Sequence, residues 1–283
     1  VDLLLKYNAY IQLRGNDGRT PFHFAVLNNN QRGFPGSVIE SFAKEHPDMV
    51  NLQSKDGKTF LHLICEDNRY AMLRFLFDCD FCSLLDFNVL SNDGSTPLHI
   101  AALNGHLNVV EYLSKKVNDP MVESDDGFSP YLLAAADGHL NLVEYYVDRI
   151  LTDDEILKEN SNGLTVLHIA ARHGSLPILE YFGTRLENIN PAAGDINFTP
   201  LHIAAGVGPL NAVIYISENV KDLAVRDIFG QTPLHWAVKF NRLSVVEYLS
   251  QTMSDIAVID IEGDTPFHYA ASLGHLRIVN YYL

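Results

Sequence analysis

Twelve histidines are the residues of this chain best suited to bind a metal ion or transfer protons. Seven of them take the same place in a short phrase that recurs along the sequence: His23, His62, His99, His168, His202, His235 and His268. A zinc site needs three or four such ligands within about 2 Å of one ion. Successive phrase histidines are a whole repeat apart, roughly 10 Å if the repeats stack as packed helices do. We therefore expect structural histidines, with neither a metal ion nor another cofactor.

The cysteines and the densest run of acids offer no stronger site. Cys79 and Cys82 have the spacing of a zinc or redox pair, but no second Cys or His pair and no βαβ pattern accompany them. Cys65 stands where other repeats carry a small packing residue. Three acids at 153–155 follow Thr152 directly before an apolar stretch, which favours a helix start.

Wider motif searches also argue against catalysis. The sequence has no nucleophile elbow, phosphate loop or glycine-rich dinucleotide turn, so we do not expect an enzyme. Three thiols without a disulfide framework favour a reducing compartment, the cytoplasm.

The short motif that carries these histidines occurs eight times in the sequence, and in one copy the histidine is replaced. Its copies begin at Thr20, Thr59, Thr96, Ser129, Thr165, Thr199, Thr232 and Thr265, in steps of 33 to 39 residues. In the third copy Gly94 suits a turn, Thr96 suits a helix N-cap and Pro97 suits the first helical position. His99 lies within reach of a reciprocal capping contact, and residues 107–113 have the apolar period of a second helix. A fixed period of this kind predicts stacked units of a turn and two helices.

These features resemble ankyrin repeats over essentially the whole chain. The resemblance rests on the T-P-L-H-x-A-A phrase, on the period near 33, and on the Gly-His-Leu turns at 105–107, 138–140 and 274–276. It implies an all-α ankyrin-repeat solenoid, a curved right-handed stack of helix–turn–helix units with β-turn or hairpin fingers. Leu132 departs from the pattern in the fourth copy, where the phrase histidine is missing.

We expect one array over residues 1–283. Residues 1–14 are interpreted as the tail of a preceding repeat, and eight repeats start near 15, 54, 91, 124, 160, 194, 227 and 260. Because the chain opens and closes within apolar second helices, whereas solenoids need polar caps, we expect it to be a segment of a longer protein.

Charge and hydropathy limit the classes of partner that we expect for this chain. The net charge is −15, which disfavours nucleic acid and favours a protein partner with a basic patch. No apolar run approaches the ~20 residues of a membrane span, so we expect no direct membrane insertion of this segment.

The ankyrin resemblance implies that fingers and first helices line a concave face that carries the partner. Outward positions on that face are mostly acidic in the first four repeats and apolar in the last four. We expect partner binding at Leu164, Ile196, Phe198, Ile228, Phe229, Trp236, Phe240, Ile261 and Leu273, with Asp125 and Asp126 on the acidic side. The alternative, strongest for Phe229 and Ile196, is packing of finger against finger.

The sequence therefore predicts a protein–protein interaction module or scaffold. The alternative is a structural ankyrin segment of a larger channel, toxin or effector whose activity lies outside this chain.

Overall fold

The computed structural model describes residues 14–27 and 36–283. Apart from Arg14, the predicted tail at 1–14 lies outside these residues. The chain divides into two compact units, Val1–Leu133 and Ala134–Leu283. In both units the described residues form short helices joined by turns. These residues include one isolated β-bridge, between Ala193 and Phe198, and no strand. The expected all-α ankyrin solenoid is thereby confirmed in its helical, strand-free character.

The helices of the first unit come in pairs that follow the sequence phrase. In chain order they are α2 (Pro21–Leu27), α3 (Gly36–Glu45), η1 (Pro47–Met49), α4 (Phe60–Glu66), α5 (Tyr70–Asp78), η2 (Asp80–Leu84), α6 (Pro97–Leu103) and α7 (Leu107–Leu113). Helix α8 (Pro130–Ala136) carries the boundary between the units. The first helices α2, α4 and α6 pack against one another in sequence, as do the second helices α3, α5 and α7.

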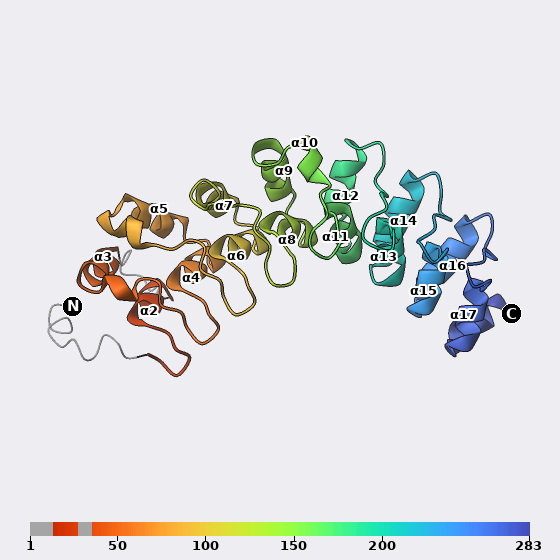
Figure 1. The fold of residues 1–283 in the computed structure, drawn as a ribbon, viewed down its shortest axis with the longest axis horizontal. Helices are drawn as coiled ribbons and strands as arrows, with labels where there is room; N and C mark the ends of the chain where they lie inside the picture. The colour runs from red at the N-terminus through yellow and green to blue at the C-terminus, as the bar shows by residue number, and fades with distance from the viewer. Residues whose placement is uncertain (1–13, 28–35) are drawn as a thin grey trace. The chain divides into compact units, whose positions relative to one another are not determined.

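The second unit repeats this arrangement. Its helices are α9 (Leu140–Arg149), α10 (Asp153–Ile156), α11 (Val166–His173), α12 (Leu176–Gly183), α13 (Pro200–Gly206), α14 (Leu210–Asn219), α15 (Pro233–Lys239), α16 (Leu243–Thr252), α17 (Pro266–Ser272) and α18 (Leu276–Tyr282). Figure 1 shows α11, α13, α15 and α17 side by side in one row, with α12, α14 and α16 in a second row.

Small residues explain how closely the first helices approach. In α13, Ala204 and Ala205 are completely buried, so neighbouring backbones can meet without a large side chain between them. The second helix α14 closes the other side of the core with Val213 and Ile216, which are also completely buried. A single repeat has too little apolar surface to fold alone, and stacking supplies the missing cover.

Six of the phrase histidines link their own repeat to the next one. In the sixth repeat the Thr199 N–H donates to His202 Nδ1 at 3.2 Å. Because Nδ1 accepts, Nε2 carries the hydrogen and donates to the Gln231 carbonyl of the next repeat at 3.0 Å. The same bond between repeats joins His23 to Lys58, His62 to Ser95, His99 to Phe128, His168 to Phe198 and His235 to Asp264. The structural role expected for these histidines is confirmed.

The turns stack as tightly as the helices do. At Gly94 φ is +72°, and a Cβ there would meet Asp125 N of the next finger at 2.5 Å. Glycine is therefore required both by conformation and by space. In the sixth repeat Asn197 takes the positive φ, which asparagine tolerates better than other side chains.

The fourth repeat should open more readily than its neighbours. Leu132 is buried but cannot accept the Ser129 N–H or reach a carbonyl of the next repeat as histidine does. The stability of a solenoid is roughly a sum over its repeats and their interfaces, so a poorly linked repeat opens locally. We expect amide hydrogen exchange to be faster in α8 than in α6 or α15. Equal protection of the three helices would contradict this prediction.

Candidate partner-binding surface

The apolar candidates in the last repeats divide into exposed and buried side chains. Exposed fractions are 49% for Ile228, 44% for Phe229, 50% for Phe240, 70% for Ile261 and 50% for Leu273. Large apolar side chains gathered at the surface mark an interaction site, because covering them stabilises a complex by about 25 cal/mol per Å². These five residues come from two neighbouring fingers and from the ends of the first helices α15 and α17.

Leu164 and Phe198 are corrections to the sequence analysis. Each is only 9% exposed, so neither offers a partner much surface. The Phe198 ring packs edge-on against His168 with centroids 5.1 Å apart, and it lies 6.1 Å from the Trp236 ring. Sequence position alone placed both residues near a finger turn. The Phe198 ring is covered by side chains of the preceding and the following repeat.

The fingers are joined to one another through their backbones. The Ile228 N–H donates to the Ile196 carbonyl, and the Ile261 N–H donates to the Phe229 carbonyl, both at 3.0 Å. Finger-to-finger packing is therefore real for the backbones of Ile196 and Phe229. It leaves almost half of the Phe229 side chain exposed, whereas Ile196 is partly buried.

Trp236 lies on α15 beside these fingers and is partly exposed. Its ring lies 5.5 Å from His202 and 6.1 Å from Phe240, measured between centroids. Its Nε1–H donates to Asp227 Oδ2 at 3.0 Å. The tryptophan is thus held by the Asp227 carboxylate and lies beside the rings of His202, Phe198 and Phe240.

A matching pair occurs one repeat later and was missed by the sequence analysis. The Tyr269 hydroxyl donates to Asp260 Oδ2 at 2.7 Å. Burial and then this hydrogen bond raise the pKa of Tyr269 to about 12, so the hydroxyl keeps its proton near neutral pH. In both repeats an aspartate stands nine residues before an aromatic residue with a polar hydrogen, and this spacing was the available signal.

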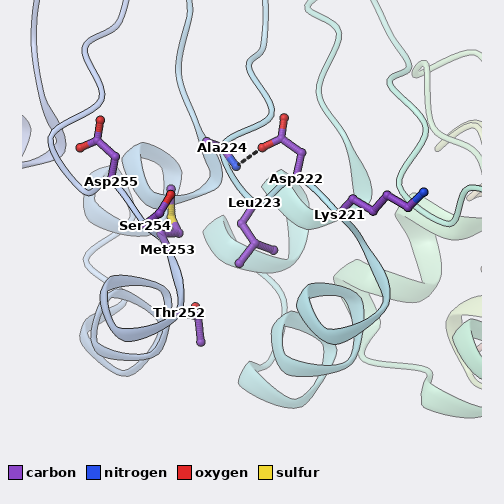
Figure 2. A pocket seen from close by; sticks show the side chains of 8 residues that line it. All are labelled: Lys221, Asp222, Leu223, Ala224, Thr252, Met253, Ser254 and Asp255. Carbon is purple, nitrogen blue, oxygen red and sulfur yellow. Dashed lines mark hydrogen bonds between the residues drawn. The ribbon is translucent and has the colours of Figure 1, made fainter.

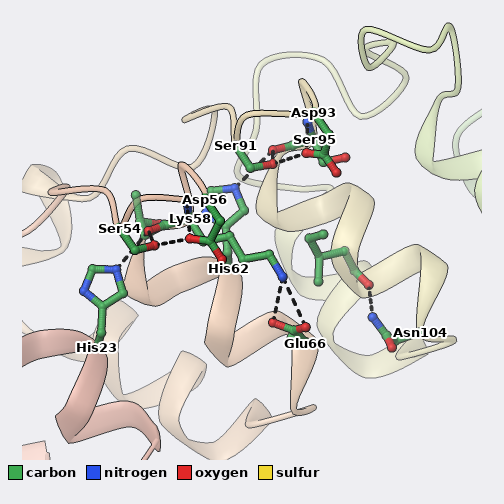
Figure 3. A network of polar contacts seen from close by, with 12 residues as sticks. His23, Ser54, Asp56, Lys58, His62, Glu66, Ser91, Asp93, Ser95 and Asn104 are labelled. Carbon is green, nitrogen blue, oxygen red and sulfur yellow. Dashed lines mark hydrogen bonds and ion pairs between the residues drawn. The ribbon is translucent and has the colours of Figure 1, made fainter. Parts of the chain in front are cut away.

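The acidic fingers of the first unit hold their carboxylates in local networks (Figure 3). Ser91 Oγ donates to Asp93, and this bond keeps the pKa of Asp93 below its ordinary value. Lys58 Nζ lies 3.1 Å from a Glu66 oxygen. Further along, Asp125 and Asp126 are exposed, as expected.

The cysteines and the remaining hollows show no sign of chemistry. All three cysteines are free thiols, and burial raises the pKa of the Cys65 thiol, which makes it a poor nucleophile. Over residues 14–27 and 36–283, no three His, Cys, Asp or Glu side chains are grouped so that they could hold a metal ion.

A hollow of about 210 Å³ lies between residues 221–224 and 252–255 (Figure 2). Its two carboxylates serve the turns they belong to. Asp222 accepts the Ala224 N–H, and Asp255 accepts the Ala257 N–H, each at 2.8 Å. The two carboxylates of the hollow therefore stabilise the loops that follow α14 and α16. Within the described part of the chain, every helix is too short or too polar to cross a bilayer.

Comparison with known proteins identifies the family. The family described as ankyrin repeats (3 copies) matches residues 31–126, 116–193, 184–260 and 201–283. The chain belongs to the ankyrin-repeat family. Ankyrin repeats are protein-interaction modules, so the fold and the general role expected from the sequence agree with this match.

Several characterised proteins resemble parts of this ankyrin array. The human transient receptor potential cation channel subfamily A member 1 is 39% identical over 102 residues, which is 36% of this chain and 8% of the channel. The rat NF-kappa-B inhibitor alpha is 34% identical over 107 residues, 37% of this chain and 32% of the inhibitor. The array thus matches less than a tenth of the channel's length and about a third of the inhibitor's.

A solved structure supports the fold. The crystal structure of the ankyrin repeat domain of Bcl-3 superposes with a TM-score of 0.60 at 22% identity. It covers 80% of this chain and 99% of the Bcl-3 domain.

Proposed function

We propose that this ankyrin array is a scaffold that binds a protein partner through the fingers and first helices of its seventh and eighth repeats. The observation that carries the proposal is the set of large, exposed apolar side chains on those two repeats. We call it the anchor surface and define it as Ile228, Phe229, Trp236, Phe240 and Ile261. Leu273, at the end of α17, extends it.

The proposal assigns binding, and no catalysis, to the array. Six of its phrase histidines are engaged in links between repeats, and burial raises the pKa of the Cys65 thiol, which disfavours the nucleophilic thiolate. The acidic balance suits a protein partner with a basic patch rather than nucleic acid. Free thiols are consistent with a reducing, cytoplasmic location.

A second candidate function has an observation of its own. The 39% identity to a segment of a human cation channel favours an ankyrin segment inside a larger protein whose activity lies elsewhere. In that case the anchor surface would contact another part of the same protein, and Phe229 and Phe240 would matter for assembly rather than for recruitment.

Capture of a partner from the source cell tests the main proposal. We expect Phe229→Ala with Phe240→Ala to weaken binding strongly, because central anchors cost about 2 kcal/mol or more each when truncated, roughly 30-fold in affinity. The matched control is Tyr248→Ala, which removes a partly exposed aromatic ring from the second helix α16. Loss of binding in the control alone, with the double variant unaffected, would place the site on the opposite face.

A further inference from the structure

Two buried aspartates fasten the fingers of the last two repeats to their first helices. Asp227 is 6% exposed and Asp260 is 5% exposed. Oδ1 of Asp227 accepts the N–H groups of Phe229 and Gln231, both at 2.9 Å, while Oδ2 accepts Trp236 Nε1–H. One carboxylate therefore fixes both the turn that carries Phe229 and the neighbouring indole ring.

The second aspartate does the same one repeat later. Oδ1 of Asp260 accepts the N–H groups of Glu262 and Asp264, at 2.9 and 3.0 Å, and Oδ2 accepts the Tyr269 hydroxyl. The hydrogen bonds outweigh burial and keep the pKa of Asp260 below its ordinary value, so the carboxylate stays ionised. Finger eight, which carries Ile261, is thereby held as firmly as finger seven.

Gln231 joins the two fastened repeats into one surface. It is 6% exposed, its Nε2 donates to the Tyr269 hydroxyl at 2.9 Å, and its Oε1 accepts from Lys239 Nζ at 3.0 Å. The ammonium of Lys239 also lies 5.5 Å from the centre of the Tyr269 ring. Side chains fixed before binding lose little entropy when a partner arrives, so this surface is preorganised.

The surface of repeats seven and eight carries negative charge near Ile261 and positive charge near α15. Exposed Glu262 and partly exposed Asp264 follow Ile261 in the same finger, and no ion pair engages either carboxylate within the described residues. The nearby cations are already directed elsewhere, since Arg226 donates to the Ile259 carbonyl and Lys239 to Gln231. The rim at finger eight is therefore negative, whereas Lys239 makes the α15 side unfavourable for another cation.

We propose that repeats seven and eight bind a peptide segment of the partner in which apolar side chains stand beside a lysine or arginine. The apolar side chains cover Phe229, Phe240 and Ile261, and the basic group pairs with Glu262 and Asp264. This inference rests on the proposed function and adds the chemistry of the partner.

Selection of short random peptides displayed on phage, with the intact array as bait, tests this chemistry. We expect retained peptides to combine apolar residues with Lys or Arg, and to be lost on a Phe229→Ala, Ile261→Ala bait. A Glu262→Lys, Asp264→Lys bait should remove the preference for basic residues. The charge control, Glu218→Lys with Glu247→Lys on the second helices, should retain it.

A synthetic peptide from the selection then gives a direct readout. Trp236 is the single tryptophan of the chain, so its fluorescence reports on this surface alone. We expect the peptide to shift the emission, and Glu262→Lys with Asp264→Lys to weaken binding at least about tenfold at low salt.

The remaining outcomes separate the inference from the proposed function. Enrichment of acidic or purely polar peptides that still depend on Phe229 and Ile261 would overturn the inference and leave the binding surface standing. Equal retention on the Phe229→Ala, Ile261→Ala bait would contradict both. Failure to enrich any peptide above background would also overturn the inference.

Discussion

Mild acid is expected to unfold this ankyrin array, with most of the loss of stability falling between about pH 6.5 and pH 4. Burial lowers the pKa of His62, His168 and His202 to about 4 from an ordinary value of 6.5. Burial also lowers the pKa of His23, His99 and His235. Burial disfavours the charged ring, and it outweighs the opposing effect of the Nε2–H bond to the carbonyl of the next repeat.

The direction of the pH dependence of stability follows from proton binding. Below pH 6.5 the unfolded chain protonates these histidines while the folded chain resists until about pH 4, so the unfolded state takes up more protons. The contribution of these histidines to the free energy of unfolding is fully present above pH 6.5. It falls as the pH decreases from 6.5 to about 4, and below pH 4 these groups cause no further loss. One pKa unit corresponds to about 1.4 kcal/mol, so each of the three contributes about 3 kcal/mol. Their sum is comparable to the whole stability of a typical domain.

Urea unfolding at a series of pH values measures this effect. The matched variant is His168→Leu, which makes the substitution that Leu132 already represents in the fourth repeat. It should lower stability at neutral pH, and it should also flatten the pH dependence by up to about 1.4 kcal/mol per pH unit, the contribution of one proton. A free energy of unfolding that is the same at pH 7 and pH 5 would show that the histidines are not buried as neutral rings.

The second large effect is expected at His202. His202→Ala should destabilise the array by about 3–5 kcal/mol, because it leaves the buried Thr199 N–H without a partner, removes one of the two hydrogen bonds to the Gln231 carbonyl and opens a cavity. Each unsatisfied buried group costs about 1–3 kcal/mol. The measurement is the urea midpoint at neutral pH, where the ring is uncharged.

The last repeat supplies the control. His268 has the same place in the phrase and accepts the Thr265 N–H at 3.1 Å, but it is exposed, and among the described residues nothing bonds to its Nε2. His268→Ala should therefore cost no more than about 1 kcal/mol. Equal losses in the two variants would mean that capping within a repeat, rather than the link between repeats, is the important role of these histidines.

Much of the fold could be predicted because ankyrin repeats depend on local rules. The N-cap at Thr199, the proline after it and the histidine three residues later act within one turn of helix, so their spacing alone locates the helix. The exposure of the candidate side chains depends instead on the neighbouring repeats. Phe198 was misjudged for that reason, since its burial is set by contacts with His168 and Trp236 rather than by its own neighbours in sequence.

The fastening of the aromatic rings was also beyond the sequence analysis. Asp227 and Asp260 stand in turns where an aspartate is expected to accept backbone N–H groups. Only the structure shows that the second carboxylate oxygen of each reaches an aromatic side chain nine residues later. That contact turns an ordinary turn residue into part of the candidate binding surface.

Hydrogen exchange of the array with and without its captured partner tests the central claim most directly. The account predicts that binding protects residues 227–231 and 260–264 together with α15, and that exchange in α14, α16 and α18 is unchanged. Protection confined to those second helices, with the fingers of repeats seven and eight exchanging as in the free array, would contradict it.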